Sequence, residues 1–179
     1  VFPSSVTVYG LTQGRAPPRR TDEPTAATDA YSTHKIACEQ RVRERDGPWS
    51  VLRVGVALDP RPRRSDARAL GTLFEVRADN RVELVHPRDA ARAVARLVER
   101  EAAWGRTLNL AGGPRCRVRL GEMLDGLLGA AGLGPLPAAA FGEREYYTDW
   151  VDTDETEALL GFQRAGFDDI VAEAADRLR

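Results

Sequence analysis

The chain has 179 residues and a formal net charge of −1, with 42% hydrophobic and 30% charged residues. This balance is typical of a soluble globular domain that is long enough to bury a core. The nearly neutral charge excludes a global field that would attract nucleic acid or an anionic membrane, and no apolar run approaches the roughly 20 residues that a membrane-spanning helix needs.

Strands and helices are predicted to alternate along the chain. Apolar runs predict strands over residues 1–8, 50–56, 82–85 and 107–110. Helical periodicity and stop signals predict helices over residues 30–46, 65–77, 88–102, 118–131, 154–160 and 167–178. Apolar strands that alternate with helices indicate a parallel sheet with crossover helices.

Cysteines and histidines are scarce. Cys38 and Cys116 are too few and too far apart for a disulfide scaffold, and they favour a reducing cytoplasm. His34 and His86 cannot hold a metal ion by themselves, so no metal site is expected. Because His86 has no evident catalytic partner beside it in sequence, we expect a structural role for it.

Lys35 is the only lysine among 26 lysines and arginines. It follows Tyr31 by four residues, on the helix that Asp29 is expected to cap. Side chains at this spacing share one helix face, so the ammonium and the phenol point into the same space. An arginine fork cannot replace a compact ammonium, and the pair is therefore a candidate site for holding a ligand beside an activated phenol.

These two residues belong to a longer ordered pattern. The pattern contains Ser4-Ser5-Val6-Thr7-Val8-Tyr9-Gly10, Asp22-Glu23-Pro24, Tyr31-x-x-x-Lys35, Val51-Leu52-Arg53, His86-Pro87-Arg88-Asp89-Ala90 and Leu159-Leu160-Gly161-Phe162. In this order the segments resemble the extended short-chain dehydrogenase/reductase family, the NAD-dependent epimerase/dehydratase group. Pro87 stands where that family usually has valine.

The resemblance implies an α/β fold, part of a Rossmann-like doubly wound parallel sheet with a small C-terminal substrate lobe. Residues 1–57 would hold the catalytic strand, the catalytic helix and the following strand. Residues 58–179 would be mainly the substrate lobe, with a strand returning to the sheet near 107–110. Gly112-Gly113-Pro114 is not the family's phosphate-binding turn, because it comes late and its proline lacks an N–H. We therefore expect the Gly-rich N-terminal half of this NAD(P)-binding domain upstream of Val1.

The resemblance assigns the catalytic roles to Ser5, Tyr31 and Lys35. Tyr31 would be the general acid/base, because the neighbouring ammonium and an oxidised nicotinamide both favour the phenolate. Lys35 would also bind the ribose hydroxyls of NAD or NADP. Ser5 would hydrogen-bond the substrate hydroxyl or carbonyl, with the preceding serine as its competitor. Val54 and Val56, at the end of the second strand, would contact the cofactor.

The substrate is less well determined. Relatives that act on nucleotide sugars often carry an asparagine where this chain has the run from Val54 to Ala57, which weakens that reading. Arg61, Arg63 and Arg64 fall where a substrate diphosphate could bind, and arginine forks suit phosphate. A solvated arginine-rich loop is the alternative. Three aromatic residues are expected mainly to fill the core, with a pocket wall as the alternative: Tyr146, Tyr147 and Trp150.

Three functions remain open from the sequence. The first is an NAD(P)-dependent oxidoreductase, epimerase or dehydratase that acts on a hydroxyl or carbonyl by hydride transfer, with a nucleotide sugar as one substrate class. The second is a reductase of a non-sugar carbonyl, including hydroxysteroid-type substrates. The third is a dinucleotide-sensing or scaffold protein, disfavoured because a pure binder has no need for the phenol. The partner expected is a small-molecule substrate, without nucleic acid or membrane, and a homodimer is left open.

Overall fold

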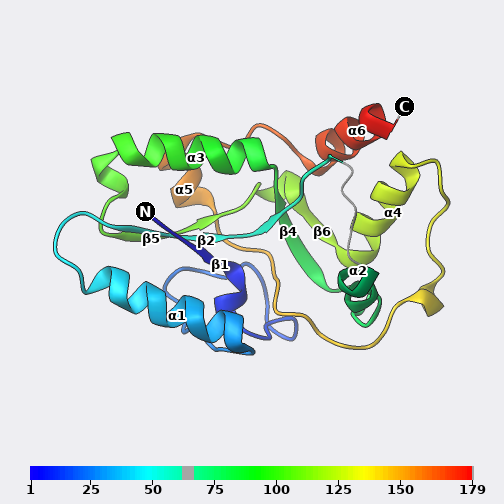
Figure 1. Ribbon diagram of the computed structural model, residues 1–179, viewed down its shortest axis with the longest axis horizontal. Helices are drawn as coiled ribbons and strands as arrows, with labels where there is room; N and C mark the ends of the chain where they lie inside the picture. The colour runs from blue at the N-terminus through cyan, green and yellow to red at the C-terminus, as the bar shows by residue number, and fades with distance from the viewer. Residues whose placement is uncertain (62–66, 179) are drawn as a thin grey trace.

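The computed structural model describes residues 1–61 and 67–178. At its centre three parallel strands pair in the order β1-β2-β5, over Phe2–Ser5, Ser50–Val54 and Arg106–Leu110. Helix α1 (Ala30–Arg43) covers one face of this sheet (Figure 1). Helices α3 (Pro87–Glu99) and α5 (Asp154–Leu160) lie on the opposite face. A parallel sheet between two helical layers is the α/β architecture that the sequence predicts.

A second sheet extends the molecule beyond the ends of these strands. It joins β3 (Val56–Ala57), β4 (Arg81–Val85) and β6 (Arg117–Arg119), with β3 parallel to β4 and β6 antiparallel to β4. Three helices lie around it, namely α2 (Ala67–Phe74), α4 (Leu120–Ala130) and α6 (Phe167–Leu178) (Figure 1). Four short 3₁₀ turns complete the described elements, at η1 Val6–Tyr9, η2 Glu101–Ala103, η3 Pro114–Cys116 and η4 Ala138–Ala140.

Several boundaries differ from the predicted ones. The first strand ends at Ser5 instead of residue 8, because the Ser5 side chain caps the 3₁₀ turn that follows. The predicted strand over 50–56 divides at Gly55, where a Cβ would lie 2.7 Å from the Glu83 carbonyl oxygen. Strand β6 was predicted as part of a helix; its Arg-Val-Arg stretch is too short to show a strand period.

Helix ends also differ. Helices α1, α2 and α3 end at residues 43, 74 and 99, each before its predicted end. Hydrophobic periodicity does not determine the last turn, which depends on local capping. By contrast, α5 and α6 span the predicted residues.

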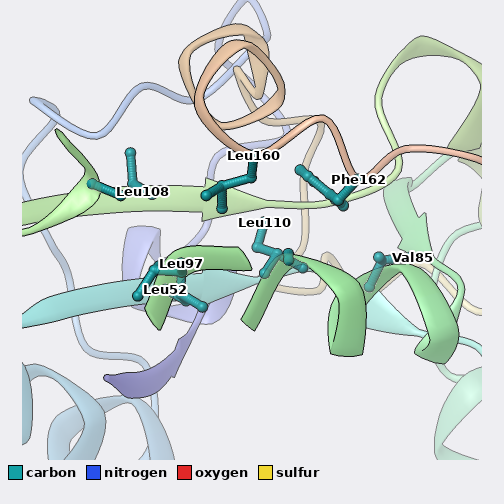
Figure 2. Close-up of a cluster of buried hydrophobic side chains, with 9 residues drawn as sticks. Leu52, Val85, Leu97, Leu108, Leu110, Leu160 and Phe162 are labelled. Carbon is teal, nitrogen blue, oxygen red and sulfur yellow. The ribbon is translucent and has the colours of Figure 1, made fainter. Parts of the chain in front are cut away.

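The main apolar core lies between the first sheet and its α3/α5 layer (Figure 2). Strands supply Leu52, Leu108 and Leu110, and the α5 region supplies Leu160 and Phe162, all essentially buried. Each such side chain contributes about 1.5–3 kcal/mol on burial. The Leu-Gly-Phe segment of the predicted family pattern is therefore a core element that holds the C-terminal region against the sheet.

The start of α3 is fixed to the same C-terminal region. His86 caps the helix by accepting the Arg88 N–H on Nδ1 at 3.0 Å, and its Nε2 lies 3.2 Å from the Glu173 carboxylate. Asp89 is buried and accepts the backbone N–H groups of Arg164 and Ala165 at 2.8 and 2.9 Å. These contacts support the structural role expected for His86. No helix in the described part of the chain is long and apolar enough to cross a membrane.

Candidate active site

The N-terminus of α1 is held by a defined cap. Asp29 accepts the Ser32 N–H at 2.7 Å, and the Ser32 hydroxyl accepts the Asp29 N–H, which completes a reciprocal capping box. Hydrogen bonds from Ser32 hold the pKa of Asp29 below its usual value. The Tyr147 hydroxyl donates to the second carboxylate oxygen of Asp29 at 2.9 Å. Burial raises the pKa of Tyr147 above that of a free phenol. This cap fixes the first helical turn, which carries Tyr31.

Tyr31 and Lys35 lie on one face of α1, as their spacing predicts. The Lys35 Nζ lies 5.5 Å from the centre of the Tyr31 ring and donates to the Pro3 carbonyl oxygen of β1 at 2.7 Å. The Tyr31 side chain is 52% exposed, so a ligand can reach its hydroxyl. The ammonium therefore joins the helix to the neighbouring strand while remaining beside the phenol.

Ser5 is the last residue of β1 and lies at the carboxyl end of the sheet, in register with Val54 at the end of β2. Its Oγ accepts the Thr7 backbone N–H at 3.2 Å and the Thr7 hydroxyl at 3.0 Å. Two accepted bonds leave the Ser5 hydroxyl proton for a ligand. The competing Ser4 points to the other face of the strand, where its hydroxyl donates to the buried Glu39 carboxylate at 2.6 Å.

A cavity of about 540 Å³ opens between the two sheets and contains both Ser5 and Tyr31 in its wall. Its described lining also includes the following residues, from β3, α2, β4, α4 and the segments beside them: Thr7, Gly55, Val56, Thr72, Leu73, Val76, Asn80, Val82, Leu120, Met123, Tyr146 and Thr148. Residues far apart in sequence thus converge on one concave site.

Of the other predicted binding residues that the structure describes, one lines this cavity and two lie elsewhere. Val56 lines the cavity, whereas Val54 packs against the main core. Arg61 is exposed, pairs with Asp59 at 2.6 Å, and lines a separate depression beside His86. Arg63 and Arg64 lie outside the described residues.

Sequence reasoning missed most of the cavity wall. Thr7, Asn80 and Thr148 carry no recognisable motif, and only the fold brings them to this place. Tyr146 lines the cavity and also packs against an apolar cluster that includes Val82, Leu84 and Leu120. For this aromatic residue, a place in the core and a place in the pocket wall are therefore not exclusive. The ring of Tyr147 stacks on that of Tyr146 with centroids 4.1 Å apart.

A buried ion pair lies behind the site, between the sheet and α1. Ser4, Arg53 and Asn109 are direct neighbours across the three parallel strands and form a polar row. Arg53 donates to both oxygens of Glu39, at 3.1 and 2.9 Å, and its guanidinium lies over the Tyr9 ring. Burial would raise the pKa of Glu39, but the hydrogen bonds from Arg53 and Ser4 outweigh it and hold that pKa below its usual value. The pair joins β2 to the helix that carries Tyr31.

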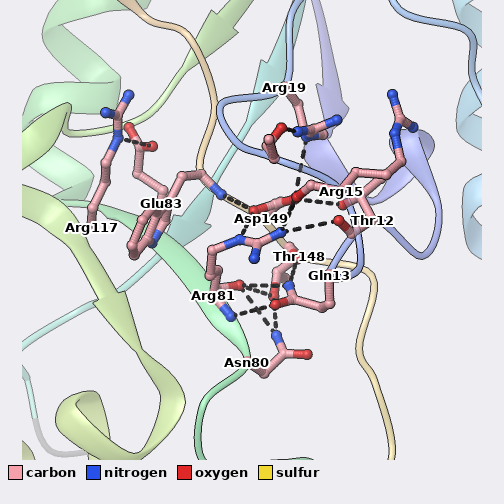
Figure 3. A network of polar contacts seen from close by, with 12 residues as sticks. Thr12, Gln13, Arg15, Arg19, Asn80, Arg81, Glu83, Arg117, Thr148 and Asp149 are labelled. Carbon is pink, nitrogen blue, oxygen red and sulfur yellow. Dashed lines mark hydrogen bonds and ion pairs between the residues drawn. The ribbon is translucent and has the colours of Figure 1, made fainter.

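A second polar network holds the loop between η1 and α1 to β4 and to the segment around Asp149 (Figure 3). Arg81 pairs with Asp149 at 2.6 Å and also donates to the carbonyl oxygens of Thr12 and Arg15. The Thr12 hydroxyl donates to Asp149 at 2.8 Å, and Arg19 pairs with the same carboxylate at 3.2 Å. The segment after Tyr147 is thereby fixed against the loop that leads into α1.

No protein-family model matches the chain, and no curated protein matches it. Solved structures do match. A short-chain dehydrogenase/reductase superfamily protein from Agrobacterium tumefaciens, with bound NAD, is 18% identical with a TM-score of 0.80; the match covers 98% of this chain and 65% of that one. The UDP-glucuronic acid 4-epimerase of Bacillus cereus, with UDP-glucuronic acid and NAD, is 17% identical with a TM-score of 0.72, covering 98% and 60%.

A third similar structure is RMD from Pseudomonas aeruginosa with NADPH, at 15% identity and a TM-score of 0.74, covering 98% of this chain and 66% of that one. The chain therefore spans between 60% and 66% of the length of these three structures. At identities this low, the structural similarity establishes the fold alone. The Rossmann-like fold implied by the sequence resemblance is confirmed, and it is the fold of short-chain dehydrogenase/reductase superfamily structures.

A nicotinamide dinucleotide is the cofactor that the resemblance implies, and the described residues fit one end of it. Tyr31 offers a phenol in the same cavity as Ser5, at the carboxyl end of β1, where ligands bind in open parallel sheets, and Lys35 offers an ammonium 5.5 Å from the phenol ring. The Gly112-Gly113 turn does not fit the pyrophosphate, because the Gly113 N–H already donates to buried Glu83 at 3.1 Å. Among the residues that the structure describes, no group of three metal-ligating side chains comes together.

Proposed function

We propose that this chain carries the catalytic and substrate-binding part of an NAD(P)-dependent enzyme of the extended short-chain dehydrogenase/reductase type. The reaction is an oxidoreduction, epimerisation or dehydration that begins with hydride transfer at a hydroxyl or carbonyl carbon. The observation that carries the proposal is the meeting of Ser5 and Tyr31 in one cavity, with the Lys35 ammonium 5.5 Å from the phenol ring. A dinucleotide-sensing or scaffold protein would not need this phenol.

Each residue has a separate task in this proposal. Ser5 donates its remaining proton to the substrate oxygen and orients the substrate. Tyr31 gives a proton to that oxygen when a carbonyl is reduced, and takes it when an alcohol is oxidised. Lys35 stabilises the phenolate and binds the ribose of the cofactor. The nicotinamide, when bound, supplies or accepts the hydride at the substrate carbon.

The remaining assignments belong to the same proposal. Residues 1–57 form the catalytic part, and residues 58–179 form mainly the substrate lobe, with β5 returning to the first sheet. Cys38 and Cys116 are free thiols, and burial raises the pKa of Cys116 to about 12. Unpaired cysteines suit a reducing cytoplasm, where we place the protein.

Two substrate classes fit this chemistry. The UDP-glucuronic acid bound in the Bacillus cereus epimerase supports a nucleotide sugar. The aliphatic side chains around the cavity support a non-sugar carbonyl compound instead.

Replacing Tyr31 by phenylalanine tests the function. In the protein as its gene encodes it, Tyr31→Phe should lower turnover at least about a hundredfold, because the proton-transfer group is lost. Dinucleotide affinity, followed by calorimetry, should stay within a few-fold of wild type. Tyr147→Phe is the matched control, since it removes a phenol oxygen that hydrogen-bonds to Asp29 and belongs to a residue outside the cavity lining, and its turnover should remain near wild type. Turnover by Tyr31→Phe close to that of the control would rule out Tyr31 as the acid/base.

A further inference from the structure

The cavity that contains Ser5 and Tyr31 has an uneven distribution of polar groups. Six of its lining side chains are aliphatic or thioether groups: Val56, Leu73, Val76, Val82, Leu120 and Met123. The ring of Tyr146 adds a further apolar surface. In the part of the chain that the structure describes, no arginine or lysine lines this cavity.

Two polar residues in the wall are already satisfied by the protein. Asn80 donates to the Arg81 carbonyl oxygen at 3.2 Å and to the Thr148 hydroxyl at 3.1 Å, and its oxygen accepts the Tyr146 N–H at 2.9 Å. The Thr148 hydroxyl donates to the Arg81 carbonyl oxygen at 3.0 Å. Both side chains are buried, so they hold the start of β4 to residues 146–148 and offer little hydrogen bonding to a ligand.

Besides the hydroxyls of Thr72 and Tyr146, which also belong to lining residues, the cavity offers hydrogen bonding at the end formed by Ser5. There the Ser5 hydroxyl proton and the Tyr31 phenol adjoin the cavity, with the Thr7 hydroxyl beside them. A ligand that places one oxygen beside Ser5 and Tyr31 satisfies these two polar groups, and the remaining atoms of the ligand contact aliphatic side chains. Burying a diphosphate or several sugar hydroxyls against that wall would leave charged and polar groups without partners, which disfavours such a ligand.

We infer that this cavity selects a compact apolar ketone, or the corresponding secondary alcohol, instead of a nucleotide sugar. The inference rests on the proposed function and specifies its substrate class. About 540 Å³ accommodates a bicyclic or larger carbocyclic ketone. Its carbonyl oxygen meets Ser5 and Tyr31, and its hydrocarbon body contacts Leu73, Val82 and the other apolar residues of the wall.

A direct binding comparison tests the substrate class without relying on turnover. The protein as its gene encodes it, saturated with NAD(P), is titrated by calorimetry with a decalone and, separately, with UDP-glucuronic acid. The decalone should bind at least about tenfold more tightly, because only its surface matches the wall. Leu73→Asn should weaken decalone binding about tenfold by placing an amide against the hydrocarbon. The control Leu133→Asn changes a leucine that is 59% exposed and absent from the cavity lining, and it should leave both affinities unchanged.

The outcomes separate this inference from the proposed function. Tighter binding of UDP-glucuronic acid, or decalone binding that Leu73→Asn leaves unaltered, overturns the apolar substrate class. Turnover of UDP-glucuronic acid that depends on Tyr31 would then leave the proposed function standing. Decalone binding that responds to Leu73→Asn, without reduction of the bound ketone by NADH or NADPH, retains the ligand class and counts against the hydride-transfer function.

Discussion

The buried ion pair behind the site gives a quantitative prediction about stability. Glu39 receives four hydrogen bonds, two of them from Arg53 and one each from Ser4 and Arg43. The side chains of Arg53 and Glu39 are 3% and 1% exposed. Arg53→Met keeps an unbranched apolar side chain, but it removes both hydrogen bonds to Glu39 and the one to the Thr21 carbonyl oxygen, and it leaves the carboxylate buried.

The expected cost follows from this arrangement. Removing one partner of a buried ion pair costs about 3–5 kcal/mol, and the two remaining donors place Arg53→Met near the lower end, at about 3 kcal/mol. Arg43→Met is the matched control, because it removes a donor to the same carboxylate from a side chain that is 35% exposed. A partly exposed pair contributes up to about 1 kcal/mol, so the control should lose far less stability.

The pH dependence has a definite sign. Because the pKa of Glu39 is held below that of an ordinary glutamate, its contribution to stability is present above the ordinary value and is lost as the pH falls through the lowered pKa. In Arg53→Met the carboxyl loses the main cause of the lowering, so burial raises its pKa. The difference in stability between wild type and variant should therefore be full at neutral pH and shrink as Glu39 becomes protonated in acid.

Urea unfolding followed by far-ultraviolet circular dichroism, at a series of pH values, measures both effects. A loss for Arg53→Met no greater than that for Arg43→Met would refute the reasoning. A loss that stays constant from neutral to acid pH would also refute it, because the cost would then not come from the buried carboxylate.

Three further variants test other parts of the account. Lys35→Arg should lower dinucleotide affinity nearly as much as Lys35→Ala, by about tenfold or more in calorimetry, because a fork cannot replace the ammonium; normal affinity in the arginine variant would contradict this. Asp89→Ala should lower the free energy of unfolding by about 2–4 kcal/mol, because two backbone N–H groups lose their acceptor. The control Asp22→Ala changes a side chain that is 73% exposed, and it should alter the free energy of unfolding little. Tyr147→Phe should cost about 1 kcal/mol in the same assay through its lost hydrogen bond to Asp29, and no cost at all would show that this bond contributes nothing.

Local patterns in the sequence predicted helix α1 well. Asp29 caps it, and the spacing of Tyr31 and Lys35 puts their side chains on one face, because capping and helical period are properties of a few neighbouring residues. The choice between Ser4 and Ser5 could not be made in this way. Strand alternation puts Ser4 and Ser5 on opposite faces of the sheet, but it does not show which face lines the cavity. The structure decides this, because Ser4 donates to Glu39 on the other face.

Features that depend on the assembled fold were not predictable. The pairing of Glu39 with Arg53 requires the packing of α1 on β2, which no spacing in the sequence encodes. The division of the second predicted strand at Gly55 arises from the close approach of the Glu83 carbonyl oxygen. The cavity wall is likewise a product of tertiary structure, since Asn80 gives no sequence signal that its amide is satisfied internally.

The central claim is that this site transfers hydride with Tyr31 as the proton-transfer group, and single-turnover reduction of the nicotinamide tests it most directly. The protein as its gene encodes it is mixed with oxidised dinucleotide and either a decalol or UDP-glucuronic acid, and the near-ultraviolet absorbance of reduced nicotinamide is followed. Transient and net hydride transfer both give this signal. The account predicts a rise with at least one alcohol in the wild-type protein, and a rise at least about a hundredfold slower in Tyr31→Phe. Equal rates in the two proteins, or no rise with either alcohol, would contradict the claim.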